Sequence, residues 1–416
     1  MDIIIGAGIT GLSYALFCGH SEYMLIEAEK SVGGYCRTIK RNGFVWDYSG
    51  HFFHFRNPYI KEIIMSAITE EDLLFCIKNT KIKYKDRYVD YPFQKNIHQL
   101  PKEELLECLY DLFTTNTDAY TTFQEMLYAK FGKSIADKFL IPYNTKLYAC
   151  NLDSLDKDAM GRFFPYAEKE DIIRNFKSKT NISYNDKFIY PKGGAIEYVN
   201  SILNKLDTDK IHTETRVISV SKEDKLVTLS NGESYHYDNL ISTVPFPNLL
   251  RLISSDYDLS SYSWNQVLVF NLGFDKKGVN VEEHWVYYPE NKYCFYRVGF
   301  YDNIMCQDRM SLYVEIGFHK DDSIRPSEWL GRVMSDLKEA GVVSSDQVLL
   351  DYEAIIMNPA YVHITDSSIK EVERIKKELA GYNIYSIGRY GSWTYCSIED
   401  NICLLYTSPS PRDKRQ

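Results

Sequence analysis

The sequence predicts an α/β protein with three parts: a parallel-sheet domain, an inserted helical domain and an antiparallel β-sheet domain. Three observations predict it. An apolar strand at residues 3–5 runs into a glycine turn and a helix, apolar residues recur at helical spacing after residue 101, and short strands follow one another between residues 266 and 318. The first observation is typical of a Rossmann-like domain that binds a dinucleotide.

The N-terminal turn has the spacing GxGxxG. Ile3-Ile4-Ile5 predicts a buried parallel strand, and Gly6, Gly8 and Gly11 follow it. Gly6 permits a tight turn, and Gly8 lets the backbone approach a pyrophosphate. Gly11 lets the next helix, expected from Ile9 to Phe17, pack against the strand. The N-terminus of that helix favours a phosphate group because its first N–H groups and its dipole point toward it.

An acidic residue closes the second predicted strand. The apolar run Tyr23-Met24-Leu25-Ile26 ends at Glu27. A carboxylate at this place can accept hydrogen bonds from a ribose diol, and it would repel the 2′-phosphate of NADP. A solvated glutamate at the end of a strand is the alternative, and the preceding glycine turn favours the nucleotide.

A second glycine pair and an arginine come a few residues later. Gly33, Gly34 and Arg37 can wrap the same pyrophosphate with N–H groups and a guanidinium. The segment 44–51 then reads FVWDYSGH. Both motifs are similar to those of FAD-binding oxidoreductases with the amine-oxidase type of fold, in which a GGxxRT clamp precedes a D-x-G-G-H segment. Ser49 departs from that pattern, where the first of the paired glycines usually stands. The resemblance implies FAD, not NAD, as the tightly held cofactor.

Composition excludes several classes of protein. The chain has 416 residues and a formal net charge of −9, which argues against nucleic acid or an anionic membrane as its main partner. No apolar run reaches 18 residues, so no membrane span is expected. Nine cysteines lack CxxC spacing and no cluster has metal-ligand spacing, which favours reduced cysteines and no metal. Because the first strand starts at residue 2, a signal peptide is not expected. A cytoplasmic location is expected.

The order of motifs along the chain predicts the domain boundaries. A helix is expected over 57–75, a strand pair over 81–89, and helical segments over 101–113, 123–131 and 135–140. A further strand at 239–244 and a last parallel strand at 383–387 are expected to return to the first sheet. The FAD-binding domain is then expected to comprise 1–80, 188–245 and 383–402, the helical domain 92–187, and the β-sheet substrate domain 246–382.

The C-terminal residues read differently from the rest. Pro409 and Pro411 cannot extend a helix that begins near Ser397. Residues 403–416 are therefore interpreted as a non-native tail, and a genuine unstructured tail is the alternative.

Several later segments resemble the UDP-galactopyranose mutase family, and its eukaryotic-type branch in particular. They are Tyr91-Pro92-Phe93-Gln94, Pro142-Tyr143-Asn144, residues 285–290, Phe295-Tyr296-Arg297 and the block from Gly388 to Tyr395. The resemblance extends from Ile3 to about Ile402, and the block from Gly388 is the most specific part.

The resemblance implies a flavin-dependent mutase that interconverts UDP-galactopyranose and UDP-galactofuranose, in nucleotide-sugar and cell-surface glycan metabolism. In this chemistry N5 of the reduced flavin attacks the anomeric carbon, UDP leaves, and the sugar recloses as the furanose. The sequence offers no Ser/His/Asp triad and no catalytic cysteine signature, which is consistent with a cofactor that forms the covalent bond. NADPH or NADH is expected as reductant.

Three sets of site residues are expected from the glycine motifs and the family resemblance. The catalytic set comprises His51, Arg162 and Arg297. The substrate set comprises Tyr91, Gln94, Asn144, Tyr148, Tyr287, Tyr361 and Tyr395. The cofactor set comprises Gly6, Gly8, Thr10, Gly11, Glu27, Gly33, Gly34, Arg37, Gly50, His51, Val217, Arg389 and Ser397.

The resemblance also assigns roles within these sets. Arg297 and the tyrosines at 287, 361 and 395 are expected on diphosphate oxygens, because a diphosphate leaving group needs cations and hydroxyl donors. Gln94 and Asn144 are expected near uridine, and His51 near flavin N5. Arg162 matches the family with an offset of one residue, and Tyr148 stands where the family often has tryptophan.

Two other functions stay open at this stage. One is an FAD-dependent oxidase or desaturase of the amine-oxidase or protoporphyrinogen-oxidase type, which needs no convergence of arginines and tyrosine hydroxyls. The other is a flavoprotein that binds a nucleotide sugar without turnover. The sequence also leaves open which sugar is used and whether the chain forms a homo-oligomer.

Overall fold

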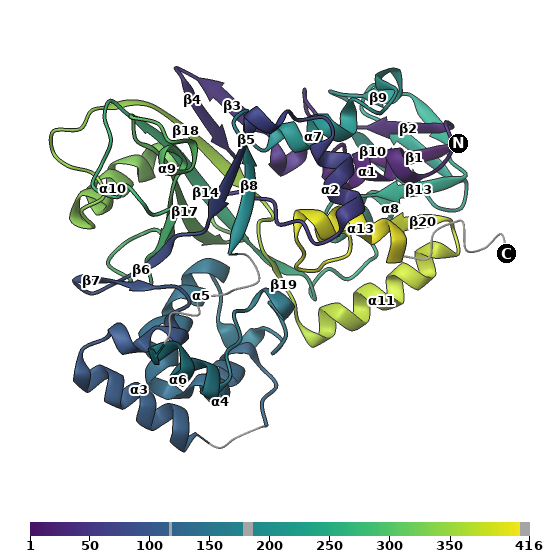
Figure 1. The fold of residues 1–416 in the computed structure, drawn as a ribbon. Coiled ribbons are helices and arrows are strands. Elements are labelled where there is room, and N and C mark those ends of the chain that lie inside the picture. Colours follow the sequence, from purple (N-terminus) through teal and green to yellow (C-terminus); the bar gives the residue numbers. More distant parts are fainter. Residues whose placement is uncertain (116–118, 178–185, 408–416) are drawn as a thin grey trace.

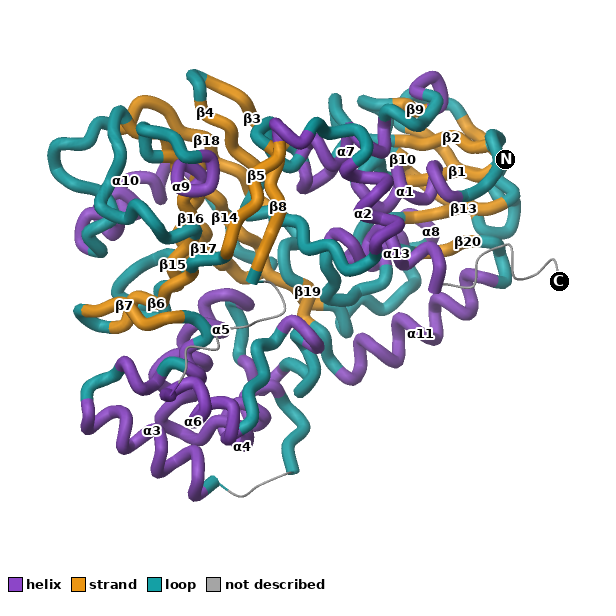
Figure 2. Tube along the Cα trace, in the orientation of Figure 1, coloured by secondary structure: helices purple, strands orange, loops and turns teal. Residues whose placement is uncertain are grey.

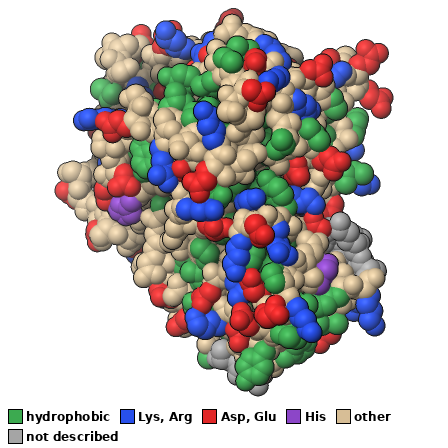
Figure 3. Space-filling view, turned by 90° about the vertical axis from the view of Figure 1, so that its left-hand side faces the viewer, with side chains coloured by type: hydrophobic (Ala, Val, Ile, Leu, Met, Phe, Trp, Pro, Cys, Tyr) green, Lys and Arg blue, Asp and Glu red, His purple; other side chains and the backbone are tan. Residues whose placement is uncertain are grey.

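The three expected parts are visible in the computed structural model, which describes residues 1–115, 119–177 and 186–407 (Figure 1). Figure 2 shows the parallel sheet and the antiparallel sheet on opposite sides of the molecule, with the helical part below the antiparallel sheet. The face drawn in Figure 3 carries acidic and basic side chains intermingled, without one large area of either sign.

The parallel sheet forms as predicted around the N-terminal strand. Its five strands lie in the order β20 (Ile384–Ser386), β13 (Asn239–Ser242), β1 (Asp2–Ile5), β2 (Tyr23–Ile26) and β9 (Ile211–His212). Ile4 pairs with Leu25 on one side and Ile241 on the other, and all three side chains are buried. The helix after β1, α1 (Ile9–Phe17), has the predicted bounds. Segments far apart in sequence thus complete one dinucleotide-type sheet.

Helices and a small meander surround this sheet. The meander comprises β10 (Val217–Ser221), β11 (Leu226–Leu229) and β12 (Ser234–His236), and Gly232 supplies its left-handed turn with a φ of 89°. The covering helices are α2 (Pro58–Met65), α7 (Ile196–Leu203), α8 (Phe246–Ile253), α11 (Asp366–Ala380), α12 (Gly388–Gly391) and α13 (Ile398–Thr407).

Three sequence-based boundaries differ from the packing. Helices α8 and α11 share a hydrophobic cluster with β1, β13 and β20, although both fall inside the expected substrate domain 246–382. Helix α13 continues to Thr407, past the expected start of the tail at residue 403, and residues 408–416 lie outside the described residues. The helix expected over 57–75 ends at Met65, because the chain then forms β5 (Leu73–Ile77), which pairs with the distant β8 (Lys187–Pro191).

The antiparallel sheet is built around a long central strand, β14 (Ser263–Phe274). Its order is β18 (Leu349–Met357), β14, β17 (Ser311–His319), β16 (Arg297–Phe300), β15 (Trp285–Tyr287), β6 (Thr80–Tyr84) and β7 (Arg87–Asp90), with β19 (Val362–His363) beside the start of β14. The predicted strand pair at 81–89 therefore lies in this sheet, where β6 runs parallel to β15. Helices α9 (Tyr301–Met305) and α10 (Pro326–Glu339) accompany the sheet.

Edge strand β18 was not predicted from the sequence. Its run includes the acidic residues Asp351 and Glu353, which weaken the apolar signal of a strand. In the fold both carboxylates bind Arg41 on the hairpin of β3 (Thr38–Arg41) and β4 (Phe44–Asp47), at N–O distances of 2.8 and 2.9 Å. Tertiary ion pairs thus accommodate the charges of this edge.

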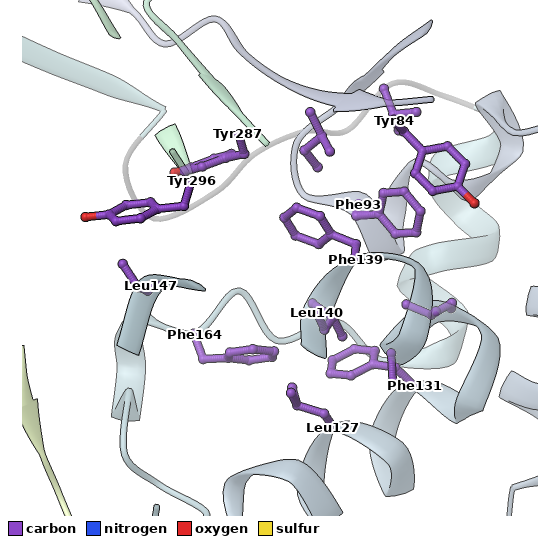
Figure 4. Close-up of a cluster of buried hydrophobic side chains, with 14 of the residues drawn as sticks. Tyr84, Phe93, Leu127, Phe131, Phe139, Leu140, Leu147, Phe164, Tyr287 and Tyr296 are labelled. Carbon is purple, nitrogen blue, oxygen red and sulfur yellow. The ribbon is translucent and has the colours of Figure 1, made fainter. Parts of the chain in front are cut away.

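The helical part has a core of its own. Its helices are α3 (Lys102–Thr114), α4 (Phe123–Ile135), a π-helical turn (Ala136–Leu140), α5 (Ile141–Tyr148) and α6 (Lys169–Lys177). Figure 4 shows the aromatic and leucine side chains that meet here, among them Phe93, Leu127, Phe131 and Phe139. The apolar stripe expected on α3 is only partly buried: Leu112 is covered, whereas Leu106 and Phe113 are exposed.

A half-buried lysine connects the helical part to the antiparallel sheet. Lys146, in the last turn of α5, has its Nζ within 2.5–3.1 Å of four backbone carbonyl oxygens in the β15–β16 connection, which share its three N–H donors. The acceptors belong to Tyr288, Glu290, Tyr293 and Phe295. Burial lowers the pKa of Lys146 to about 8.

Candidate functional site

Two cavities meet where the parallel sheet, the antiparallel sheet and the helical part come together. The larger has a volume of about 530 Å³ and lies against β1 and α1. The smaller, of about 240 Å³, lies against the helical part. Both cavities are lined by Gly50, Arg297, Tyr361 and Tyr395. These four residues mark the junction between the two spaces.

Glycines form the wall of the larger cavity next to α1. Gly6 has a φ of 97°, in the left-handed region that favours glycine. Gly8 and Gly34 approach so closely that a Cβ on Gly34 would lie 3.3 Å from the Cα of Gly8. A Cβ on Gly11 would lie 1.9 Å from the Gly6 carbonyl oxygen, so Gly11 packs the helix on the strand and does not line the cavity. The backbone here is open to a large flat or extended group.

Glu27 lines the larger cavity at the end of β2, as the ribose prediction requires. Its carboxylate accepts hydrogen bonds from the N–H groups of Ala7 and Glu29, at 2.8 and 2.9 Å. Arg37 and Val217 also line the cavity, and Nε of Arg37 donates to the Gly34 carbonyl oxygen at 2.9 Å. The acid therefore connects the first glycine turn with the end of the second strand.

The loop after β4 carries Ser49, Gly50 and His51 to the cavity wall. His51 Nδ1 lies 3.2 Å from the Ser49 carbonyl oxygen. Burial lowers the pKa of His51 to about 4, so the imidazole is neutral near pH 7. A Cβ on Gly50 would lie 2.5 Å from the Tyr313 hydroxyl, which explains why glycine stands there.

Asp47 fixes the start of this loop from a fully buried position. Its carboxylate accepts hydrogen bonds from the Thr38 hydroxyl at 2.5 Å, the Tyr190 hydroxyl at 2.7 Å and the Ala195 N–H at 3.0 Å. Burial raises the pKa of Asp47 to about 6, although these donors favour the charged form. The loop is therefore held by side chains from several elements.

Residues between 389 and 401 complete the larger cavity. Arg389 lies over the rings of Tyr395, Tyr361 and Tyr390, 4.5–5.8 Å from their centroids. Asn401 in α13 was not predicted, yet its Oδ1 accepts from the Arg389 N–H at 2.7 Å and the Thr10 hydroxyl at 3.1 Å. No local motif marks such an asparagine.

Ser397 caps helix α13 and does not line a cavity. Its hydroxyl oxygen accepts from the Asp400 N–H at 3.1 Å, and its own N–H donates to the Asp400 carboxylate at 2.8 Å. It is thus the N-cap of α13 and lies outside the linings of both cavities.

A buried ion pair dominates the junction. Arg297 donates from Nε and Nη2 to the two carboxylate oxygens of Glu315, at 2.6 and 2.7 Å. Burial by itself lowers the pKa of Arg297, but the charge of Glu315 outweighs it and raises the pKa well above the usual value. Glu315 is 1% exposed and was not predicted, because nothing local marks it as the partner of Arg297.

Aromatic hydroxyls line the rest of the smaller cavity. Tyr91 and Tyr287 pack with ring centroids 5.1 Å apart, and Tyr361 stacks on Tyr395 at 5.8 Å. The Tyr287 hydroxyl accepts from Trp285 Nε1 at 3.0 Å. Burial raises the pKa of Tyr91, Tyr287 and Tyr361, so their phenols stay protonated and can donate hydrogen bonds.

Two further predicted residues line the smaller cavity. Asn144 donates from Nδ2 to the Leu140 carbonyl oxygen at 2.7 Å, and its buried Oδ1 has no hydrogen-bond partner within the described residues. Arg162 is half-exposed, forms an ion pair with Asp400 and lies over the ring of Phe163, 4.7 Å from its centroid.

Gln94 and Tyr148 do not line either cavity. Gln94 is fully buried and donates to the carbonyl oxygen of Pro165, which itself lines the smaller cavity. Tyr148 is 1% exposed and packs behind Tyr361, with ring centroids 6.0 Å apart. Both residues therefore lie behind the side chains that line the smaller cavity.

Within the described ranges no group of three or more His, Cys, Asp or Glu side chains is placed to hold a metal ion. No helix in these ranges has the length and apolar character needed to cross a membrane.

Sequence comparison assigns the chain to a family. The family described as flavin containing amine oxidoreductase matches residues 19–353, most of the chain. The chain belongs to this family. Among similar proteins, protoporphyrinogen oxidase 2 of Arabidopsis thaliana is 22% identical over 91% of this chain and 88% of its own length. Coproporphyrinogen III oxidase of Staphylococcus aureus is 22% identical over 66% of this chain and 68% of its own length.

Solved structures share the fold. A reduced UDP-galactopyranose mutase superposes with a TM-score of 0.89 at 26% identity, over 96% of this chain and 91% of the other. A putative protoporphyrinogen oxidase from Exiguobacterium superposes with a TM-score of 0.76 at 16% identity, over 98% of both chains. These likenesses confirm the predicted fold class and the resemblance to the mutase family.

Proposed function

We propose that the larger cavity binds FAD. Gly8 and Gly34 approach closely on the cavity wall, where a side chain on Gly34 would crowd the Gly8 backbone, and the N-terminus of α1 lines the same wall. Glu27 is placed to accept from a ribose diol, and Arg37 supplies a cation on the same cavity. The isoalloxazine would lie toward the other end, beside Gly50 and His51. These residues fit a flavin dinucleotide, in agreement with the family.

We further propose that the protein interconverts UDP-galactopyranose and UDP-galactofuranose. The observation that carries this proposal is the junction: Arg297, Tyr361 and Tyr395 belong to both cavities at once. A diphosphate held by a guanidinium and phenol hydroxyls there would lie directly beside a flavin ring. The likeness to a reduced UDP-galactopyranose mutase, over nearly the whole chain, supports the same reading.

Each residue at the smaller cavity then has a physical task. Arg297, Tyr287 and Tyr361 hold the diphosphate before and after it leaves the sugar, because charge-assisted and phenolic donors stabilise its oxygens. Asn144 offers a buried acceptor that has no partner in the described residues and suits a uracil N–H. Arg162 lies at the outer wall, where its ion pair with Asp400 leaves it half-exposed.

His51 lies beside the flavin as an uncharged ring in this proposal. Because its pKa is depressed by burial, the neutral ring adds no positive charge beside the flavin. When bound and reduced, FAD supplies the electron-rich nitrogen that attacks the anomeric carbon. A pyridine nucleotide is proposed as its reductant.

The second candidate is a flavin oxidase that dehydrogenates an organic substrate. The sequence likeness to protoporphyrinogen and coproporphyrinogen oxidases favours it. Such an enzyme gains nothing from an arginine and tyrosine hydroxyls at the flavin edge, which makes it the weaker proposal.

One experiment separates the two. Dithionite-reduced protein is incubated with UDP-galactofuranose, and the products are separated by chromatography. Formation of UDP-galactopyranose is expected only with the reduced protein, since the oxidised flavin nitrogen has no available electron pair. Equal conversion by the oxidised protein, or no conversion together with oxygen consumption on a porphyrinogen, would overturn the mutase proposal.

A further inference from the structure

A short contact connects the loop before His51 to the ion pair at the junction. The Ser49 hydroxyl donates to Oε1 of Glu315, the same oxygen that accepts from Nη2 of Arg297. Ser49 is 8% exposed and Glu315 is 1% exposed. One carboxylate oxygen is therefore shared between the serine and the arginine, away from bulk water.

This sharing determines how the guanidinium is oriented. Rotation of a glutamate carboxylate about its last bond is broad, so its hydrogen-bond partners decide its plane. A two-point arginine–carboxylate contact is close to planar, and the guanidinium therefore follows the carboxylate. The N–H groups of Arg297 that do not face Glu315 are the ones available to the smaller cavity, which Arg297 lines.

The serine itself stands on a fixed backbone. Asp47, two residues earlier, is held by three hydrogen bonds. The Ser49 carbonyl oxygen accepts from the Tyr301 hydroxyl at 3.4 Å, and His51 Nδ1 lies 3.2 Å from it. A hydroxyl on so constrained a segment can impose a position on its partner.

We propose that Ser49 is a positioning residue which, through Glu315, holds Arg297 in the orientation that binds the diphosphate of a nucleotide sugar. This inference rests on the proposed function. It gives a task to the one residue that departs from the paired-glycine pattern, where a glycine has no hydroxyl to offer. The paired-glycine pattern has no hydroxyl at this position, so we expect the effect of the serine on ligand affinity.

The test measures UDP affinity by titration calorimetry on the FAD-loaded protein. Ser49→Ala and Ser49→Gly should each weaken UDP binding about three- to tenfold, within the range of coupling inside one hydrogen-bond network. FAD content should stay as in the wild type, and Ser49→Thr should restore most of the affinity. Ser201→Ala is the matched control, because Ser201 is a buried serine on α7 whose hydroxyl donates to the Glu197 carbonyl oxygen.

A second comparison, in protein that carries Arg297→Met, shows whether the effect of Ser49 on UDP affinity depends on Arg297. With Arg297→Met present, adding Ser49→Ala should cause no further loss of UDP affinity. An equal loss in both backgrounds, unchanged affinity in Ser49→Ala, or loss of FAD from that variant would overturn the positioning role. A wild-type protein that retains FAD but binds no UDP would overturn the proposed function first, and this inference with it.

Discussion

The walls of the two cavities differ in how much backbone and how many side chains form them. One wall of the larger cavity is formed by backbone: left-handed glycines, a helix N-terminus and the ends of parallel strands. The smaller one is shaped by long side chains that come from the helical part, the antiparallel sheet and the C-terminal block. A wall of closely packed backbone tolerates almost no added atom, whereas a wall of side chains can lose one contact and keep the others. The predictions below test this difference, in order of decreasing effect.

Gly11→Ala should have the largest effect. The added Cβ would stand 1.9 Å from the Gly6 carbonyl oxygen, so α1 must move away from β1. We expect a loss of stability of about 3 kcal/mol or more, together with loss of bound FAD. Absorbance at flavin wavelengths and thermal melting measure both.

Gly331→Ala is the matched control for that variant. Gly331 lies inside α10, and a Cβ there meets no atom within 4 Å. Alanine is a better helix former than glycine, so this change should be neutral or stabilise by up to about 1 kcal/mol. If Gly11→Ala behaves like Gly331→Ala, the larger cavity does not depend on close backbone packing.

Arg297→Ala should weaken UDP binding about ten- to a hundredfold, since a hydrogen bond to a charged group contributes roughly 1.5–3 kcal/mol. FAD content should remain high, because Arg297 touches only the junction end of the larger cavity. The substitution also leaves the buried Glu315 without its cation, so Arg297→Met combined with Glu315→Gln serves as the companion variant. Normal UDP affinity in both would remove Arg297 from the site.

His51 should make the stability depend on pH. Burial lowers its folded pKa to about 4, below the ordinary value near 6.5, so the unfolded chain binds the proton more readily between these values. Its contribution is present above about pH 6.5 and is lost as the pH falls toward 4, by roughly 2–3 kcal/mol. Urea unfolding at several pH values should show a smaller acid loss in His51→Gln. The pKa values of His284 and His363 are likewise lowered to about 4 by burial, so only the difference between the two proteins reports on His51.

The smallest effect is expected from Arg162→Gln. Its ion pair with Asp400 is half-exposed, and such pairs contribute about 0.2–1 kcal/mol to stability. UDP affinity should fall a few-fold at low salt, and the difference should shrink as salt is added. An effect as large as that of Arg297→Ala would mean that the outer wall, and not the junction, holds the diphosphate.

The same contrast explains what could be predicted from the sequence. Gly6, Gly8, Gly34 and Glu27 lie within one local stretch, where spacing alone indicates their common cavity, and β1, α1 and β2 have the expected positions. Glu315 could not be found in this way, because its partner Arg297 lies on a neighbouring strand and no motif surrounds it.

Other differences have the same cause. The segment after Met65 looks helical by itself but pairs with a strand more than a hundred residues away. Gln94 and Tyr148 were expected at the substrate from the family resemblance, yet both are buried and lie outside the lining of the smaller cavity. Which side of a wall a residue faces depends on contacts that one sequence does not reveal.

Lys146 has a mechanical consequence. Its ammonium group gathers four carbonyl oxygens much as a bound cation organises a loop, and it belongs to α5 while the oxygens belong to the connection between β15 and β16. These hydrogen bonds therefore join the helical part to the hairpin that carries Tyr287 and Arg297. Moving α5 away from this hairpin would break these hydrogen bonds, so the parts of the smaller cavity wall that α5 and the hairpin supply are held together.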